Sequence, residues 1–194
     1  MNNNFAQIIS KDEIKELPLH KFPGTTYIID SCKDLSDICK YLSRQPLLGF
    51  DTETRPSFKK GVQHQVALLQ FATRDYAFLF RLYKMGLPKE IVNILKNGNI
   101  IKAGVAINDD IKTLQKLQDF TPGGFLELQK YVKQFGIESN GLKKLTAIVL
   151  NFRISKSQRL TNWENPELTQ SQIDYAATDA WVCYEIYHRL SRLE

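Results

Sequence analysis

Cysteine is scarce in this sequence and follows no recognisable pattern. Cys32, Cys39 and Cys183 make an odd number, and no two of them form a C-x-x-C pair. This spacing indicates neither a disulfide framework nor a zinc site, so we expect a reducing, cytoplasmic environment. The sequence has no apolar run of about 18 residues, and its N-terminus lacks a positive start followed by an apolar segment. The sequence therefore predicts neither secretion nor membrane insertion.

Acidic residues are missing from one stretch, between Gly141 and Trp163. The whole chain of 194 residues carries 26 basic and 21 acidic side chains and a net charge of +5. The local excess of positive charge equals that net charge, and it marks either a solvated face or a surface for a polyanion. The length fits one domain, and no internal repeat or low-complexity segment occurs. The five basic residues of the stretch are Lys143, Lys144, Arg153, Lys156 and Arg159.

Two carboxylates stand at the end of an apolar segment, in the stretch LLGFDTET from Leu47 to Thr54. The apolar residues indicate a buried strand, and side chains two apart on a strand point to the same side. Asp51 and Glu53 would therefore project together from the strand end. Two like charges repel strongly in a poorly solvated place unless a cation neutralises them. A divalent metal would do so; the alternative is a pair of acids that caps the strand and binds water or a lysine.

Alternating strand and helix patterns predict an α/β core with a mixed sheet. Arg74 and Asp75 separate two apolar runs and indicate a hairpin, so part of the sheet is expected to be antiparallel. Residues 1–24 are polar and end in Pro23 and Gly24, which predicts an N-terminal arm laid on a domain of residues 25–194. We expect strands at 25–30, 47–54, 65–73, 76–80 and 100–105, and helices at 32–44, 87–95, 111–117, 126–135, 142–150 and 170–190.

The last expected helix carries a tyrosine and an aspartate on one face. Thr169 and Gln172 have the spacing of a capping box, which predicts a helix from about residue 170 to 190. Tyr175 and Asp179 lie four residues apart and share a face. Apolar stripes on two sides predict burial on both, where an unpaired charge is costly. Asp179 is therefore expected either to bond locally with Tyr175 or to bind a cation.

Three acidic stations come from separate segments: Asp51 with Glu53, Asp110 at the start of an expected helix, and Asp179. A site that binds two divalent ions about 4 Å apart for phosphoryl transfer needs this many oxygen donors. Asp109 competes with Asp110 for the second station.

These segments resemble a known family. GFDTE, QVALLQ, KAGVAINDDIKTL and LTQSQIDYAATDAW, in this order, are similar to the motifs of the DEDDy branch of the DnaQ-like 3′-5′ exonucleases, which includes Werner-type exonuclease domains and ribonuclease D. The resemblance runs from about Thr25 to Leu190. It implies an RNase H-like fold with a mixed sheet of five to six strands flanked by helices.

The resemblance also implies cofactors and roles. Two Mg²⁺ or Mn²⁺ ions would be held by Asp51, Glu53, Asp110 and Asp179, while Tyr175 would hydrogen-bond the attacking water. Asp110 is preferred to Asp109 because counting from Gly104 puts it at the family's catalytic position. The expected reaction removes nucleoside 5′-monophosphates from the free 3′ end of a nucleic acid.

Substrate contacts are less strongly indicated. Thr52, Leu69 and Gln70 would either pack near the terminal nucleotide or serve ordinary sheet packing. Lys156 and Arg159 are candidates for phosphate binding, which is independent of sequence. Trp163 would either stack on a base or lie in the core. The family's W-x-x-R-P-L is replaced after Trp163 by ENPEL, so any role of that arginine is in doubt in this chain.

Three functions follow as hypotheses. The leading one is an exonuclease acting on single-stranded or frayed DNA, because the resemblance is closer to the Werner-type domain. The others are an RNA 3′-end trimming ribonuclease and a binding module without catalysis. Loss of an acidic station would favour the binding module, and none is lost. The oligomeric state is not indicated.

Overall fold

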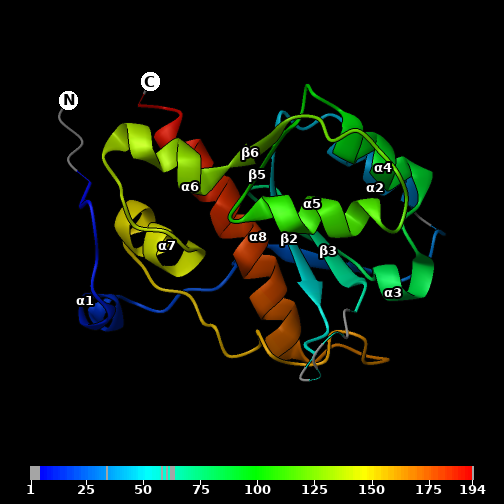
Figure 1. Cartoon of the computed structure of the whole chain (residues 1–194), viewed down its shortest axis with the longest axis horizontal. Helices are drawn as coiled ribbons and strands as arrows, with labels where there is room; N and C mark the ends of the chain where they lie inside the picture. Colours follow the sequence, from blue (N-terminus) through cyan, green and yellow to red (C-terminus); the bar gives the residue numbers. More distant parts are fainter. Residues whose placement is uncertain (1–4, 34, 58, 60, 62–63, 194) are drawn as a thin grey trace.

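The computed structural model of this chain describes residues 5–33, 35–57, 59, 61 and 64–193, and it is built on one six-stranded sheet (Figure 1). The strand order is β1-β4-β3-β2-β5-β6. β2 and β4 each pair antiparallel with β3, whereas β1 with β4, β2 with β5 and β5 with β6 are parallel. The predicted mixed sheet and its hairpin are confirmed. The strands are β1 (Thr25–Ile29), β2 (Leu47–Thr54), β3 (Val66–Ala72), β4 (Tyr76–Phe80), β5 (Ile101–Gly104) and β6 (Phe125–Glu127).

Helices cover both faces of the sheet. α2 and α4 pack on one face around Phe50, Phe71 and Phe80. α7 and α8 pack on the other, and α8 crosses β2, β3 and β4 (Figure 1). The helices are α1 (Lys11–Glu16), α2 (Leu35–Leu42), α3 (Leu82–Met85), α4 (Lys89–Lys96), α5 (Ile107–Gln115), α6 (Leu128–Tyr131), the 3₁₀ helix η1 (Val132–Phe135), α7 (Leu142–Leu150) and α8 (Gln170–Leu190).

The start of α5 differs from the prediction. A helix was expected from residue 111, but α5 begins at Ile107, so Asp110 lies one turn inside it. Ala106 precedes the helix in the left-handed conformation, with φ of 61°. The Glu127 carboxylate accepts hydrogen bonds from the N–H groups of Ala106 and Ile107, both at 3.0 Å. A residue about twenty positions away thus caps this helix, which no local sequence pattern reveals.

The helix predicted at 126–135 is wrong at its start. Residues 125–127 form the edge strand β6, parallel to β5, and the helical part begins only at Leu128. The segment is too short to show a strand pattern of its own, and pairing with β5 decides its conformation. Glu127 consequently stands at the end of β6, where it reaches the first turn of α5.

The N-terminal segment lies along the body of the molecule. α1 begins at a capping box formed by Ser10 and Glu13. The chain that follows α1 runs past α7 toward α8 before it enters β1 (Figure 1). Phe22 is buried and packs against Trp181 of α8, with ring centroids 5.8 Å apart. Within the described part of the chain, no helix is long and apolar enough to cross a membrane.

Candidate active site

The end of β2 carries the first pair of carboxylates. Asp51 and Glu53 are half-buried and follow the fully buried residues of the strand, in the alternation that sends both to one side. Gly49 lies two residues before Asp51 and therefore on the same side of the strand. A Cβ built there would lie 1.9 Å from the carbonyl oxygen of Ala180. The missing side chain therefore lets α8 approach the backbone of β2 directly.

α8 supplies the next two groups. Its predicted capping box is confirmed: Thr169 accepts from Gln172 N–H, and the Gln172 side chain accepts from Thr169 N–H at 3.1 Å. The helix buries Tyr175 and Asp179 on the face turned to β2, with exposed fractions of 7% and 8%. Direct packing of the helix on the strand thus brings Asp179 to the pair on β2.

Three carboxylates meet at this point. Oxygen atoms of Asp51, Glu53 and Asp179 lie within 4.8 Å of one another. Burial raises the pKa of Glu53 to about 10, with the neighbouring carboxylates adding to the rise and Arg159 opposing it. Burial likewise raises the pKa of Asp51, and the negative charges of Asp179 and Asp110 raise it further. The fold therefore holds acidic groups where their negative charges are unfavourable without a cation.

The Asp179 carboxylate is only partly satisfied by protein groups. Burial raises its pKa to about 7, and a hydrogen bond from Tyr175 and the charge of Lys156 oppose the rise. Among the described residues, its Oδ1 atom is buried without a hydrogen-bond partner. Burial and the nearby carboxylates Asp179 and Glu53 raise the pKa of Tyr175 further above its usual range, so its hydroxyl keeps its proton.

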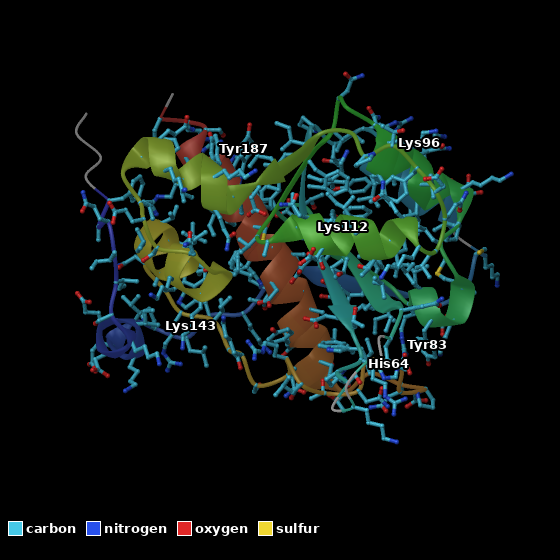
Figure 2. All side chains as sticks on the ribbon, viewed as in Figure 1. His64, Tyr83, Lys96, Lys112, Lys143 and Tyr187 are labelled. Atoms are coloured by element: carbon cyan, nitrogen blue, oxygen red, sulfur yellow. The ribbon has the colours of Figure 1, made fainter. Side chains whose placement is uncertain are left out.

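Asp110 lies next to this cluster, whereas Asp109 does not. The Thr52 hydroxyl donates a hydrogen bond to Asp110 Oδ1, and the Asp110 charge contributes to the raised pKa values of Asp51 and Glu53. Asp109 pairs instead with Lys112 at 3.2 Å on the exposed side of α5 (Figure 2). The structure thus places Asp110, the preferred residue, beside the other carboxylates.

Two basic residues from the stretch without acids lie near the carboxylates. Lys156 lowers the pKa of Asp179 and Arg159 lowers that of Glu53, so both positive charges act on the cluster. Both side chains are exposed. Their assignment as phosphate contacts stays a prediction.

The loop between α7 and α8 that carries these residues is tied to the sheet. The Arg81 guanidinium donates to the carbonyl oxygens of Asn165 and Pro166, and the Tyr83 hydroxyl donates to Asn165 at 2.8 Å. Figure 2 shows Tyr83 and His64 at the same end of the molecule. These bonds hold the segment that departs from the W-x-x-R-P-L pattern.

The structure contradicts direct substrate contacts for three of the candidates. Trp163 is 0% exposed and packs against Tyr175, with ring centroids 6.0 Å apart, so it is a core tryptophan and offers no face to a base. Leu69 and Gln70 are fully buried as well. Thr52 is half-buried and bonds Asp110, which makes it a neighbour of the carboxylates. Side chains inside the core cannot touch a ligand without moving, so ordinary sheet packing accounts for Leu69. The Gln70 amide is equally buried, and among the described residues neither its oxygen nor its nitrogen has a hydrogen-bond partner.

Sequence reasoning missed one acidic residue, Glu127. Its carboxylate holds the start of α5 and raises the pKa of Asp110, whose main cause of elevation is burial. No sequence signal marked this role; in the structure Glu127 is also the N-cap of α6, accepting from Gln129 N–H at 3.1 Å. It acts on the site by orienting the helix that carries Asp110.

The donor set fits a divalent cation. All candidate ligands are carboxylate oxygens, which Mg²⁺ and Mn²⁺ prefer. A bound positive ion would give the buried Oδ1 of Asp179 a partner. It would also stabilise the ionised form of the neighbouring carboxylates and so lower their raised pKa values. Asp51, Glu53 and Asp179 would hold such an ion, with Asp110 completing the set.

The carboxylate arrangement is accompanied by a family match. A family described as 3′-5′ exonuclease matches residues 26–193. The chain belongs to the 3′-5′ exonuclease domain family. The predicted resemblance is thereby confirmed.

Relatives of this exonuclease domain are larger proteins. A mouse protein named bifunctional 3′-5′ exonuclease/ATP-dependent helicase WRN is 35% identical over 187 residues, covering 91% of this chain and 13% of the relative. A Drosophila melanogaster protein named exonuclease 3′-5′ domain-containing protein 2 is 31% identical over 193 residues, covering 97% of this chain and 32% of its own length. The exonuclease domain spans less than a third of either relative.

Solved structures share the fold of this exonuclease domain. The Aedes aegypti Nibbler EXO domain has a TM-score of 0.77 at 22% identity, covering 90% of this chain and 94% of that one. Escherichia coli RNase D has a TM-score of 0.77 at 21% identity, covering 87% and 44%. The EXD2 exonuclease domain soaked in Mn has a TM-score of 0.51 at 26% identity, covering 86% of this chain and 89% of that one. These likenesses confirm the predicted RNase H-like fold class.

Proposed function

We propose that this chain is a metal-dependent exonuclease that removes nucleoside 5′-monophosphates from the 3′ ends of DNA. The observation that carries the proposal is the convergence of Asp51, Glu53 and Asp179, with Asp110 beside them and Tyr175 bonded to Asp179. Membership of the 3′-5′ exonuclease family supports the reaction and its direction. The choice of DNA follows the closer resemblance of the sequence motifs to the Werner-type domain than to ribonuclease D, and RNA is the alternative polymer.

The carboxylates hold the cofactors in this proposal. Asp51, Glu53, Asp110 and Asp179 bind two divalent ions, Mg²⁺ or Mn²⁺, which supply Lewis acidity and activation of water when they are bound. An exonuclease domain soaked in Mn, with 26% identity, supports this assignment. The carboxylates must be ionised to bind, so metal binding releases the protons that burial retains on them.

Tyr175 orients the attacking water. Its hydroxyl stays protonated and donates to Asp179, which leaves its lone pairs to accept a hydrogen bond from water. A group with so high a pKa positions the water and does not act as a strong base. The new bond forms between the water oxygen and phosphorus, and the bond from phosphorus to the 3′ oxygen of the remaining strand breaks.

Lys156 and Arg159 bind phosphates of the strand. Both are exposed and lie near the carboxylates, where they compensate for the repulsion between the acidic cluster and a polyanion. Such contacts do not depend on sequence, as a trimming exonuclease requires.

The test uses matched 5′-labelled single strands of DNA and RNA and a recessed DNA duplex, incubated with Mg²⁺, Mn²⁺ or EDTA. The Asp179→Ala protein serves as the control. A ladder that shortens from the 3′ end of DNA, and that needs both metal and Asp179, is the expected result. Stronger shortening of RNA would overturn the DNA assignment. Binding without a ladder in either metal would show a binding module instead of an enzyme.

A further inference from the structure

A pocket of about 340 Å³ has Tyr175 in its lining. Three segments line it: residues 19–21 of the N-terminal arm, the loop around Ser155 and Ser157, and the first turns of α8 with Asp174 and Tyr175. Tyr175 therefore borders both this pocket and the carboxylate cluster. A ligand in the pocket would touch the residue that faces the reacting group.

The arm forms a wall that the fold holds in place. Phe22 N–H donates to Thr178 Oγ1 of α8 at 2.9 Å in a buried position. His20 N–H donates to the Arg153 carbonyl at 2.9 Å, and the His20 ring stacks on Phe152, with centroids 4.8 Å apart and planes 13° apart. The Arg153 guanidinium in turn donates to Leu17. The wall is thus anchored to α8 and to the loop before it.

The pocket offers hydrogen-bond donors and an exchangeable cation. Lys21 pairs with Asp174 at 2.8 Å, but its side chain is 70% exposed, and ion pairs this exposed contribute little stability. The hydroxyls of Ser155 and Ser157 bond each other at 3.0 Å, which uses one of their two hydrogens and leaves one to donate. Lys156 lies between these serines in the chain.

We propose that this pocket binds the nucleic-acid strand next to its 3′-terminal nucleotide, with Lys21 and the two serines contacting phosphate and sugar. The proposal rests on the proposed exonuclease function. The matched family segment begins at residue 26, so the wall formed by residues 19–21 lies outside it. In this proposal, Lys21 of the arm adds a second positive charge to the phosphate-binding surface that Lys156 provides near Tyr175. An incoming phosphate takes the place of Asp174 as the partner of Lys21.

Two substitutions separate binding from a merely structural ion pair, because the two roles predict different signs. If Lys21 binds phosphate, Lys21→Ala weakens binding, whereas Asp174→Asn frees the ammonium and removes a repelling charge, so it tightens binding. If the ion pair only holds the arm, both substitutions break it and both weaken binding. Lys96→Ala removes one exposed charge from α4, at the opposite end of the molecule (Figure 2), and is the matched control.

The experiment measures fluorescence anisotropy of a labelled single-stranded DNA with the full chain, in EDTA and with Asp179→Ala added to every variant to prevent cleavage. We expect Lys21→Ala to raise Kd about 3- to 10-fold and to lower the salt dependence by about one ion. Asp174→Asn should lower Kd severalfold, and Lys96→Ala should leave it unchanged. Thermal melting of each variant verifies folding.

The outcomes distinguish this proposal from the proposed function. Equal weakening by both substitutions, or no change in either, would overturn the pocket proposal whether or not the wild-type protein degrades DNA. Opposite shifts in Kd without any 3′ ladder would retain the pocket and refute the exonuclease. A ladder whose KM rises in Lys21→Ala at unchanged kcat would agree with both. A fall in kcat at unchanged KM would contradict a role in strand binding.

Discussion

At the scale of single residues, the carboxylates that would bind cations lower the stability of the metal-free fold. Asp51, Glu53 and Asp179 are held close together where burial and mutual repulsion raise their pKa values. Asp179 retains a buried oxygen that no described protein group bonds. Such groups lower the stability of a protein unless a ligand satisfies them. The consequences are measurable in single substitutions.

Asp179→Asn should separate stability from function. The native pKa of Asp179, about 7, lies above the unfolded value of 3.8, so the folded state binds more protons between these values. Through Asp179, stability of the metal-free wild type must therefore fall as pH rises through that window, and the amide removes this contribution while those of Asp51 and Glu53 remain. We expect Asp179→Asn to gain unfolding free energy relative to wild type between pH 5 and pH 8 in EDTA, measured by urea denaturation.

The same variant should lose at least about 100-fold in cleavage rate, because a metal ligand is gone. Wild-type turnover in Asp179→Asn would show that the carboxylate is not a ligand. A stability difference independent of pH would contradict the shifted pKa.

Tyr175→Phe should slow cleavage and leave metal affinity nearly unchanged. Phenylalanine keeps the packing against Trp163 but lacks the hydroxyl that would orient water. We expect the single-turnover rate to fall by about 10- to 100-fold, while Mn²⁺ titration calorimetry gives a similar Kd. Equal losses in rate and in metal affinity would make Tyr175 a structural residue of α8.

At the scale of elements, the site depends on how α8 lies on β2. The capping box at Thr169 begins the helix, and the side chain of Gln172 also donates to Thr161 and Asn162 in the preceding loop. Gly49 allows the helix backbone to touch the strand. Correct spacing between these two elements decides whether Asp179 reaches Asp51.

Gly49→Ala should disturb this contact. A Cβ there would lie 1.9 Å from Ala180 O and 2.8 Å from Tyr184 N, both backbone atoms of α8 that cannot rotate away. We expect the free energy of unfolding to fall by about 2–4 kcal/mol, measured by denaturant titration, and metal affinity to fall with it.

Gly98→Ala is the matched control, because nothing lies within 4 Å of a Cβ at Gly98. A destabilisation of the same size in both variants would point to general effects of glycine replacement and would refute the close packing of α8 on β2.

At the scale of the whole molecule, cations should stabilise the fold. Strand β2 and helices α5 and α8 bring their carboxylates together only in the folded chain. A ligand that binds only the folded state raises stability by about 2.7 kcal/mol at 100 times its Kd. We expect saturating Mg²⁺ or Mn²⁺ to raise Tm by roughly 5–10 °C over EDTA, since each kcal/mol shifts a chain of this size by about 2–4 °C.

Differential scanning fluorimetry measures this shift, and Asp179→Asn provides its control. The shift should be much smaller in that variant. An unchanged Tm of the wild-type protein with 10-fold different metal concentrations would contradict a carboxylate metal site.

Local sequence patterns determined much of this molecule. The D-x-E strand, the hairpin of β3 and β4, and the capped helix α8 are specified by neighbouring residues, because strand alternation and helix capping act over a few positions. The family resemblance, carried by the same short segments, pointed to Asp51, Glu53, Asp110, Tyr175 and Asp179, and the fold places these side chains next to one another.

Tertiary structure alone decided which candidates can meet a ligand. In the sequence, Trp163 and Gln70 are both candidates for contact with a ligand, but in the structure both are buried. Lys21 of the distant arm, in contrast, lines a pocket together with Tyr175. β6 and the start of α5 depend on the pairing with β5 and on Glu127. Burial and capping by remote groups arise from packing between segments far apart in the chain, and such contacts leave no periodic trace in the sequence.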